Sequence, residues 1–210
     1  MARFRKTAVA AVAVSAVVLT PSAAYARDFG LNDFARQGST MSSMSWGTYR
    51  GELIDLSPNT TDVKTTDMFD GARATAVMIS MGESSYFKLT IRRIDEGAIG
   101  KEYGAHLHDG KCVAGDGAAA GPHYNTTRDA NGVATVISDE TEVWLDFDVN
   151  SEGNARTTAN VPFVPPLGEH SIVIHASHTL HKTGPGGTVG TAGARLACLP
   201  LTIKSFSNAN

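Results

Sequence analysis

Short apolar runs recur along the chain from residue 72 onward, and they have the length and spacing of β-strands. In residues 143–149 apolar positions alternate with polar ones, as expected of a strand with one buried face. Segments rich in glycine, aspartate and asparagine separate the runs and predict turns. The expected strands are residues 72–81, 86–94, 103–108, 143–149, 156–161, 171–176 and 196–203. So many short strands, with no helical period of useful length beyond residue 26, predict an all-β antiparallel barrel or sandwich.

The segment 27–67 is patterned differently from the domain that follows it. It is rich in Ser, Thr, Met and Asp and shows no sustained hydrophobic period, although it contains Trp46 and Tyr49. We interpret it as an extended arm or an extra strand ahead of a domain at residues 68–205. Residues 206–210 are then a C-terminal tail.

The N-terminus has the pattern of a secretory signal peptide over residues 1–26. Basic residues precede an apolar run at 8–19 made almost wholly of Ala and Val, and Ala24-Tyr25-Ala26 offers a small-residue cleavage site. A transmembrane anchor is the alternative, but it needs about 20 apolar residues and this run is shorter. Cleavage leaves 184 residues and changes the formal charge from −3 to −6, because three basic and no acidic residues are removed.

Four histidines have the setting of metal ligands. His106 and His108 are separated by one residue on an expected strand, so their side chains project from the same face. His123 lies in a following loop and can approach as a third ligand, and His175 ends another strand-like run. Four imidazoles without carboxylate or thiolate suit copper better than calcium or magnesium, although ligand type alone also allows zinc.

These histidine motifs resemble those of the copper/zinc superoxide dismutase family. The resemblance covers about residues 72–203 and includes Gly-Pro-His-Tyr-Asn at 121–125 and Gly-Thr-Ala-Gly-Ala-Arg-Leu-Ala-Cys at 190–198, in which Thr191 is a departure. It implies an eight-stranded antiparallel Greek-key barrel or sandwich. It also implies conversion of superoxide to oxygen and hydrogen peroxide by cycling between Cu(II) and Cu(I).

The resemblance assigns roles to individual residues. It implies one copper ion per chain, bound by His106, His108, His123 and His175. The family's active-site arginine falls on Arg195, which would guide the superoxide anion, and its intrasubunit disulfide falls on Cys112 and Cys198. Two cysteines in an exported chain independently favour a disulfide. We expect His123 to take part in catalysis, and two alternatives stay open. It is either an ordinary copper ligand or a ligand that leaves copper on reduction and carries the proton.

One part of the family pattern is missing. Ordinary members bind zinc through the equivalent of His123, two further histidines and an aspartate in the stretch that follows, whereas residues 124–142 contain no histidine. A zinc site needs about four donors, and this stretch offers only carboxylates, which we expect to solvate the loop surface. Those acids are Asp129, Asp139, Glu140 and Glu142. Zinc is therefore not expected, and the chain resembles the copper-only branch seen among secreted actinobacterial members.

Three histidines lie outside the four expected ligands: His170, His178 and His181. We expect solvated loop histidines at 178 and 181, and the alternative is a weak second metal site or copper-loading site near His175. The family's loop aspartate that links the copper and zinc ligands has no evident counterpart.

The sequence thus favours a secreted or cell-envelope, copper-only superoxide dismutase, with superoxide as its partner. A non-enzymatic copper-binding or buffering protein on the same fold is the alternative, and retention of Arg195 favours the enzyme because a buffer needs no anion guide. A purely structural β-domain would not need the four histidines. We expect no nucleic-acid partner and, after signal cleavage, no membrane anchor. The sequence contains no pattern from which an oligomeric state can be predicted.

Overall fold

The computed structural model describes residues 44–57, 68–184 and 187–204, which all belong to the compact unit 39–210. The expected signal peptide at 1–26, most of the segment 27–67 and the tail 206–210 lie outside the described residues. No helix among the described residues is long and apolar enough to cross a membrane.

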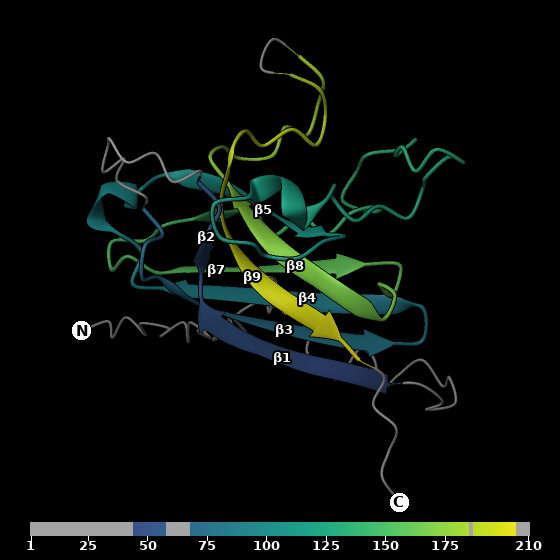
Figure 1. Cartoon of the computed structure of the whole chain (residues 1–210), viewed down its shortest axis with the longest axis horizontal. Coiled ribbons are helices and arrows are strands. Elements are labelled where there is room, and N and C mark those ends of the chain that lie inside the picture. Colours follow the sequence, from purple (N-terminus) through teal and green to yellow (C-terminus); the bar gives the residue numbers. More distant parts are fainter. Residues whose placement is uncertain (1–43, 58–67, 185–186, 205–210) are drawn as a thin grey trace, which may run out of the picture. The chain divides into compact units, whose positions relative to one another are not determined.

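The described residues fold into two antiparallel sheets, which Figure 1 shows one behind the other. One sheet has the order β1-β3-β4-β7 and the other β2-β9-β8-β5-β6. The strands are β1 Met44–Glu52, β2 Ile54–Asp55, β3 Arg73–Met81, β4 Ser84–Arg92, β5 Glu102–His108, β6 Phe147–Asp148, β7 Ala155–Val161, β8 Gly168–His175 and β9 Arg195–Ile203. Two short 3-10 helices complete the described elements, η1 Glu96–Ala98 and η2 Gly117–Ala120.

The connections are those of a Greek key. β4 pairs with β7, while β5 and β6, which lie between them in the sequence, belong to the other sheet. β5 in turn pairs with β8, which comes after the return to the first sheet. The all-β Greek-key sandwich expected from the sequence is therefore confirmed.

The structure distinguishes the alternatives for one segment, where residues 44–52 form the extra strand, and differs from the expectation for another. Residues 44–52 form β1 and pair with β3 along its whole length, so this part of the segment 27–67 is an edge strand of a sheet. The expected strand 143–149 is regular only at β6, because the chain before β6 makes single bonds to β5 rather than a continuous ladder. One such contact is the isolated bridge between Trp144 and His106.

The core lies between the sheets and follows from alternation along the strands. In β3 and β4 every second side chain is buried, and the residues between face outward. Phe87, Leu89 and Ile91 from β4 join Leu107 of β5 and Ile172 of β8 in one buried cluster. Gly82 turns the chain between β3 and β4 with φ 61°, a conformation that favours glycine.

Two long loops follow the strands that end in histidines. The loop 109–146 follows β5, which ends at His108, and the loop 176–194 follows β8, which ends at His175. Figure 1 shows both loops extending beyond the strands, in teal-green and yellow-green. Since these strands are neighbours and antiparallel, the position of each histidine depends on the register between them.

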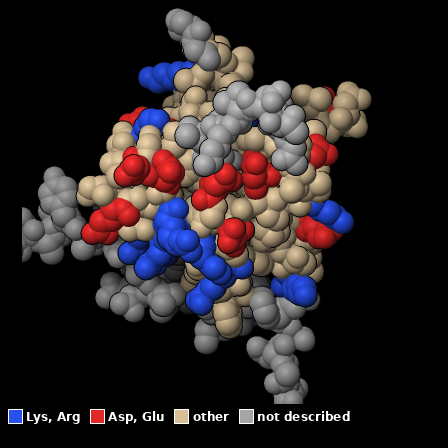
Figure 2. Space-filling model, turned by 60° about the vertical axis from the view of Figure 1, so that its left-hand side comes forward, with Lys and Arg blue, Asp and Glu red and all other residues tan. Residues whose placement is uncertain are grey.

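Charge is unevenly spread over the surface. Figure 2 shows Lys and Arg side chains gathered in one patch with Asp and Glu beside it. Within the first sheet, the pairing of β3 with β4 places Arg73 opposite Arg92. The net charge of the chain therefore does not describe the local field at any one site.

Candidate metal centre

Four histidine side chains from three separate parts of the chain meet where β5 and β8 pair. β5 supplies His106 and His108, which share a face because they alternate along the strand. β8 ends at His175, which its register places opposite Gly104 of β5. His123 comes from the loop after β5 and forms a backbone bridge with His108. The structure thus brings together the four residues that the sequence singled out.

The inner nitrogen atoms of the four rings face one another at short distances. Nδ1 of His106 lies 3.0 Å from Nε2 of His123. Nε2 of His108 lies 3.2 Å from Nε2 of His175. The ligand atoms of all four rings lie within 4.8 Å of one another. His106, His108 and His175 are buried, while His123 is half-buried and forms the more open side of the group.

Two of the outer ring nitrogens lie against backbone carbonyl oxygens. Nδ1 of His108 is 3.0 Å from the carbonyl oxygen of Gly121, and Nδ1 of His175 is 3.2 Å from that of Gly193. A carbonyl oxygen can only accept, so both rings carry their proton on Nδ1 and donate it outward. This arrangement fixes the tautomer and the orientation of each ring, as is usual for histidines that bind metals.

The outer nitrogen of His106 is held by a relay of two side chains. Its Nε2 lies 2.6 Å from the hydroxyl oxygen of Thr179, and that hydroxyl donates to Oδ1 of Asp146 at 2.6 Å. Because the only hydroxyl proton goes to Asp146, Thr179 accepts from His106, which therefore carries its proton on Nε2. The sequence did not single out Thr179 or Asp146, and it offered no evident counterpart of the family's loop aspartate that links the copper and zinc ligands. The structure shows that Thr179 connects His106 to the carboxylate of Asp146.

The outer nitrogen of His123 meets the carboxylate of Glu142. Nδ1 of His123 lies 2.9 Å from Oε2 of Glu142, which also accepts from the indole of Trp144 at 2.9 Å. The other carboxylate oxygen, Oε1, accepts from Nδ2 of Asn125 at 3.0 Å. The sequence led us to expect Glu142 to solvate the loop surface, and this was wrong because its side chain is 3% exposed. The strand-like alternation of side chains at 143–149 could have been extended back by one residue. Glu142 would then lie on the same face as Trp144, two positions later.

The Glu142 carboxyl is ionised despite its burial. Burial by itself raises its pKa, but the hydrogen bonds from His123, Trp144 and Asn125 outweigh that effect, and the pKa lies below its ordinary value. Glu142 therefore places a fixed negative charge beside the outer nitrogen of His123.

The histidine-free loop is held by its own polar side chains. The side-chain amide of Asn125 donates to the carbonyl oxygen of Val136 at 2.8 Å, and its Oδ1 accepts from the backbone N–H of Thr127 at 2.7 Å. Arg128 donates to Asp109 at 2.9 Å and also to the carbonyl oxygen of His123. These contacts hold the loop around His123.

The geometry leaves the inner nitrogens with lone pairs that point at one another. Burial holds the pKa of His106 and of His108 well below the ordinary value, and the neighbouring histidines add to the effect. Burial also lowers the pKa of His175 to about 4. These three rings are therefore neutral near pH 7. Converging lone pairs repel unless a cation lies between them, so this donor set fits an ion such as copper or zinc.

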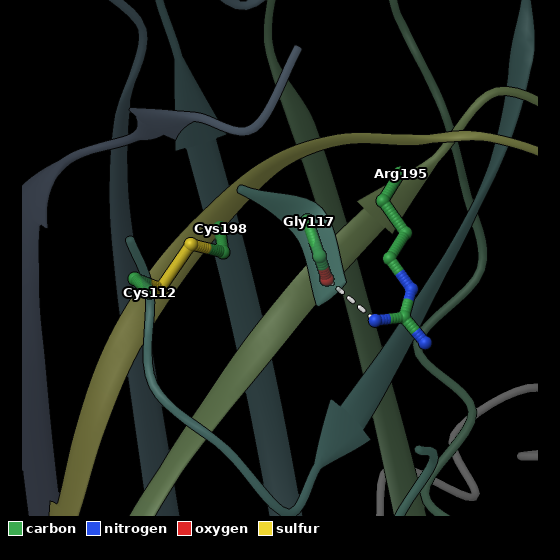
Figure 3. The surroundings of a disulfide bond; sticks show 4 residues. All are labelled: Cys112, Gly117, Arg195 and Cys198. Atoms are coloured by element: carbon green, nitrogen blue, oxygen red, sulfur yellow. Dashed lines mark hydrogen bonds between the residues drawn. A yellow bond between two sulfur atoms is a disulfide. The ribbon is translucent and has the colours of Figure 1, made fainter. Parts of the chain in front are cut away.

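Arg195 lies beside the histidine group and is held by the loop that carries a cysteine. It is the first residue of β9 and pairs with His175 across the bulged β8–β9 ladder. Its guanidinium donates to the carbonyl oxygen of Gly117 at 2.5 Å, as Figure 3 shows. The positive charge of Arg195 contributes to the lowered pKa of both His108 and His175, which places it within electrostatic reach of the site.

The expected disulfide is present. Cys112 of the loop 109–146 and Cys198 of β9 are bonded, with their Cα atoms 5.9 Å apart. Figure 3 shows the bond close to the contact between Gly117 and Arg195. The disulfide therefore ties the loop that holds the Arg195 guanidinium to the strand that carries Arg195. A disulfide is also typical of proteins that work in an oxidising environment.

The remaining histidines differ from one another. His170 is 5% exposed, with its ring nitrogens near the carbonyl oxygens of His108 and Pro166. His178 and His181 are exposed, as the sequence predicted for this loop.

The chain is similar to several known proteins. A family model described as copper/zinc superoxide dismutase matches residues 74–199 of the chain. A curated copper–zinc superoxide dismutase of Cryptococcus neoformans var. grubii is 32% identical over 112 residues, which cover 49% of this chain and 71% of that protein. Among solved structures, the clock protein EA4 is 16% identical with a TM-score of 0.49, over 80% of this chain and 98% of that one.

Proposed function

The chain belongs to the copper/zinc superoxide dismutase family, and we propose that it is a secreted superoxide dismutase that uses copper and no zinc. The observation that carries the proposal is the protonation pattern of the four histidines. Each ring has an oxygen partner for its outer nitrogen, which leaves one inner nitrogen per ring free to bind a metal ion.

The proposed copper ligands are Nδ1 of His106 and Nε2 of His108, His123 and His175. When bound, a copper ion supplies a one-electron couple between Cu(II) and Cu(I). Neutral imidazoles suit this ion because they serve as ligands in both oxidation states. The β5–β8 register and the outer hydrogen bonds then hold three of the rings rigidly, and the half-buried His123 faces the more open side.

The absence of zinc is proposed from the partner of His123. To bridge two metal ions, His123 would have to use Nδ1 as well as Nε2, but Nδ1 lies 2.9 Å from a carboxylate oxygen of Glu142. The stretch 124–142 contains no histidine to complete a zinc site. We infer that Glu142 takes over the orienting task that a second ion would perform.

His123 and Arg195 are the proposed catalytic residues. The guanidinium of Arg195 stays positively charged and can attract the superoxide anion to the cleft and orient it by forked hydrogen bonds. Nε2 of His123 is the atom that can take up a proton if the ring leaves the ion, and the negative charge of Glu142 stabilises the resulting imidazolium. Two superoxide ions and two protons then yield oxygen and hydrogen peroxide.

Secretion is proposed from two independent features. The N-terminal residues have the pattern of a cleavable signal peptide. The Cys112–Cys198 disulfide is typical of proteins in oxidising compartments.

Metal analysis and a dismutation assay test the proposal together. After exhaustive dialysis of the purified protein, we expect about one copper and no zinc per chain, with a dismutation rate well above that of free copper. Stoichiometric zinc retained beside copper would refute the copper-only assignment. Retained copper with a rate no better than that of free copper would instead identify a copper-buffering protein on the same fold.

A further inference from the structure

A second group of metal-binding side chains lies outside the four histidines. We call Asp146, His178 and His181 the rim cluster; their ligand atoms lie within 4.8 Å of one another. It shares no residue with the four-histidine site. The histidines are open to solvent, with side-chain exposures of 42% for His178 and 57% for His181, whereas Asp146 is 11% exposed.

The distances within the rim cluster suit groups arranged around an ion. Oδ2 of Asp146 lies 3.6 Å from Nδ1 of His178 and 3.9 Å from Nε2 of His181. Both distances are too long for good hydrogen bonds. Neighbouring ligands of a first-row divalent ion lie about 2.8 to 3.4 Å apart, from tetragonal to tetrahedral geometry, so both exposed rings must move inward by roughly 1 Å to complete the site.

Asp146 is already oriented by contacts on its buried side. Its Oδ1 accepts from the hydroxyl of Thr179 at 2.6 Å and from the backbone N–H of Ala105 at 3.3 Å. These bonds occupy Oδ1 and leave Oδ2 directed at the two histidines. The carboxylate is therefore positioned before an ion arrives, which reduces the cost of binding.

The two rings are constrained more loosely. The ring of His181 packs edge to face against Trp144, with centroids 5.0 Å apart, and Trp144 is itself held by Glu142. Nδ1 of His178 lies 3.1 Å from the carbonyl oxygen of Thr179, a contact that ion binding at Nδ1 would replace. Three protein ligands and a solvent-exposed side leave at least one position open, as in sites where ions exchange.

We propose that the rim cluster is a second, exchangeable site for Cu(II). Two imidazoles and a carboxylate bind first-row divalent ions, and among these the Irving–Williams order places Cu(II) highest. Asp146 lies beside both sites, since its Oδ1 is 3.7 Å from Nε2 of His106 and is joined to it through the hydroxyl of Thr179. A copper ion held at the rim therefore sits next to the buried site and is placed to supply it.

Copper binding at equilibrium tests the site directly. Protein loaded with one copper equivalent is titrated with CuSO₄ in equilibrium dialysis and analysed for metal. We expect the wild type to take up a second equivalent that a mild chelator removes. His178→Ala/His181→Ala should bind it at least about tenfold more weakly, whereas Lys182→Ala, an exposed change beside His181, should bind it as the wild type does.

Electron paramagnetic resonance distinguishes this site from unspecific copper. Two nearby Cu(II) ions broaden each other's signals, so the wild type with two equivalents should show a coupled spectrum that the double variant lacks. Equal affinity in the wild type and the double variant, or an uncoupled second signal, would overturn the proposal. His181→Ala alone, expected to show intermediate affinity, provides a second variant if the double variant folds poorly.

The outcome is separate from that of the proposed function. Dismutation by the protein with one copper equivalent should be the same in the wild type and the double variant, because neither rim histidine belongs to the four-histidine site. A protein that binds the second ion but does not dismutate superoxide would overturn only the proposed function. Dismutation without second-ion binding would overturn only the rim site.

Discussion

The carboxylate of Glu142 lies 2.9 Å from Nδ1 of His123 and is buried together with the indole of Trp144, which donates to the same oxygen. This pair decides which nitrogen of His123 faces the other three histidines. It also places a negative charge against the one ring that is half-buried rather than fully enclosed. Glu142 thereby links the histidine-free loop to the metal centre.

Replacing Glu142 with glutamine should weaken the site. The amide of glutamine has no negative charge, and only its oxygen can accept a hydrogen bond. The donors His123, Trp144 and Asn125, which share two carboxylate oxygens in the wild type, would therefore compete for one acceptor atom. We expect Glu142→Gln to lower copper affinity or the dismutation rate about 10- to 100-fold, the range for outer partners of metal-bound histidines. Copper competition with a chelator and the rate per bound copper measure the two effects. Glu140→Gln, an exposed change in the same loop, should have no effect, and equal values for both variants would contradict this role.

The stability of the copper-free protein should fall on acidification. Burial lowers the pKa of His175 from 6.5 to about 4, so between these values the unfolded chain binds a proton that the folded site does not. Stability is fully present above pH 6.5 and declines until the pH passes about 4, which amounts to about 3 kcal/mol for this ring. His106 and His108, whose pKa values are also lowered by burial, add losses in the same direction.

Urea unfolding of the copper-free protein at about pH 7 and about pH 5 measures this loss. The variant His175→Gln should show a smaller decline, because it lacks one of the groups that titrates. A free energy of unfolding that does not change over this interval would show that the rings take up protons in the folded protein as they do in the unfolded chain.

The strands and the pairing of His106 with His108 were accessible from the sequence because both depend on local pattern. His106 and His108 share a face through strand alternation alone, and the β-strands follow from short apolar runs. The meeting of His123 and His175 with this pair came from the family resemblance, since no local rule fixes which loop and which strand approach β5.

The outer partners were not accessible in this way. Thr179 and Asp146 are separated by 33 residues, and they bond only because the loop after β8 folds over the segment before β6. Glu142 was assigned to the surface because acids in a polar loop are usually solvated. Its burial depends on donors from Asn125 and Trp144, and a network of this kind has no signature in a single chain.

The disulfide should stabilise the fold and hold Arg195 in place. Cys112 and Cys198 are 86 residues apart in the sequence, a loop for which the chain-entropy model gives about 4 to 5 kcal/mol. Thiol titration of the denatured, unreduced protein should find no free sulfhydryl, and two reactive thiols would disprove the bond. Cys112→Ser/Cys198→Ser should lower the free energy of unfolding by several kcal/mol, measured in urea against the oxidised wild type.

Arg195 separates an enzyme from a copper buffer. Arg195→Ala removes no proposed metal ligand, so copper should stay bound, while loss of a fixed positive charge beside His108 and His175 should slow dismutation. Arg195→Lys should fall between the two proteins, because the charge is kept but the forked hydrogen-bond geometry is lost. Arg156→Ala, an exposed arginine on β7 in the other sheet, is the matched control and should dismutate superoxide as the wild type does.

Ionic strength tests whether Arg195 acts through its field. Salt screens charges over about 10 Å at ~0.1 M, so the rate of the wild type should decline as salt rises, and the rate of Arg195→Ala should decline less. Copper content and dismutation rate are measured for all four proteins at low and moderate salt. Equal rates at equal copper loading would remove Arg195 from the mechanism. A slower Arg195→Ala with an unchanged salt dependence would mean that the guanidinium orients superoxide in the cleft without drawing it in from a distance.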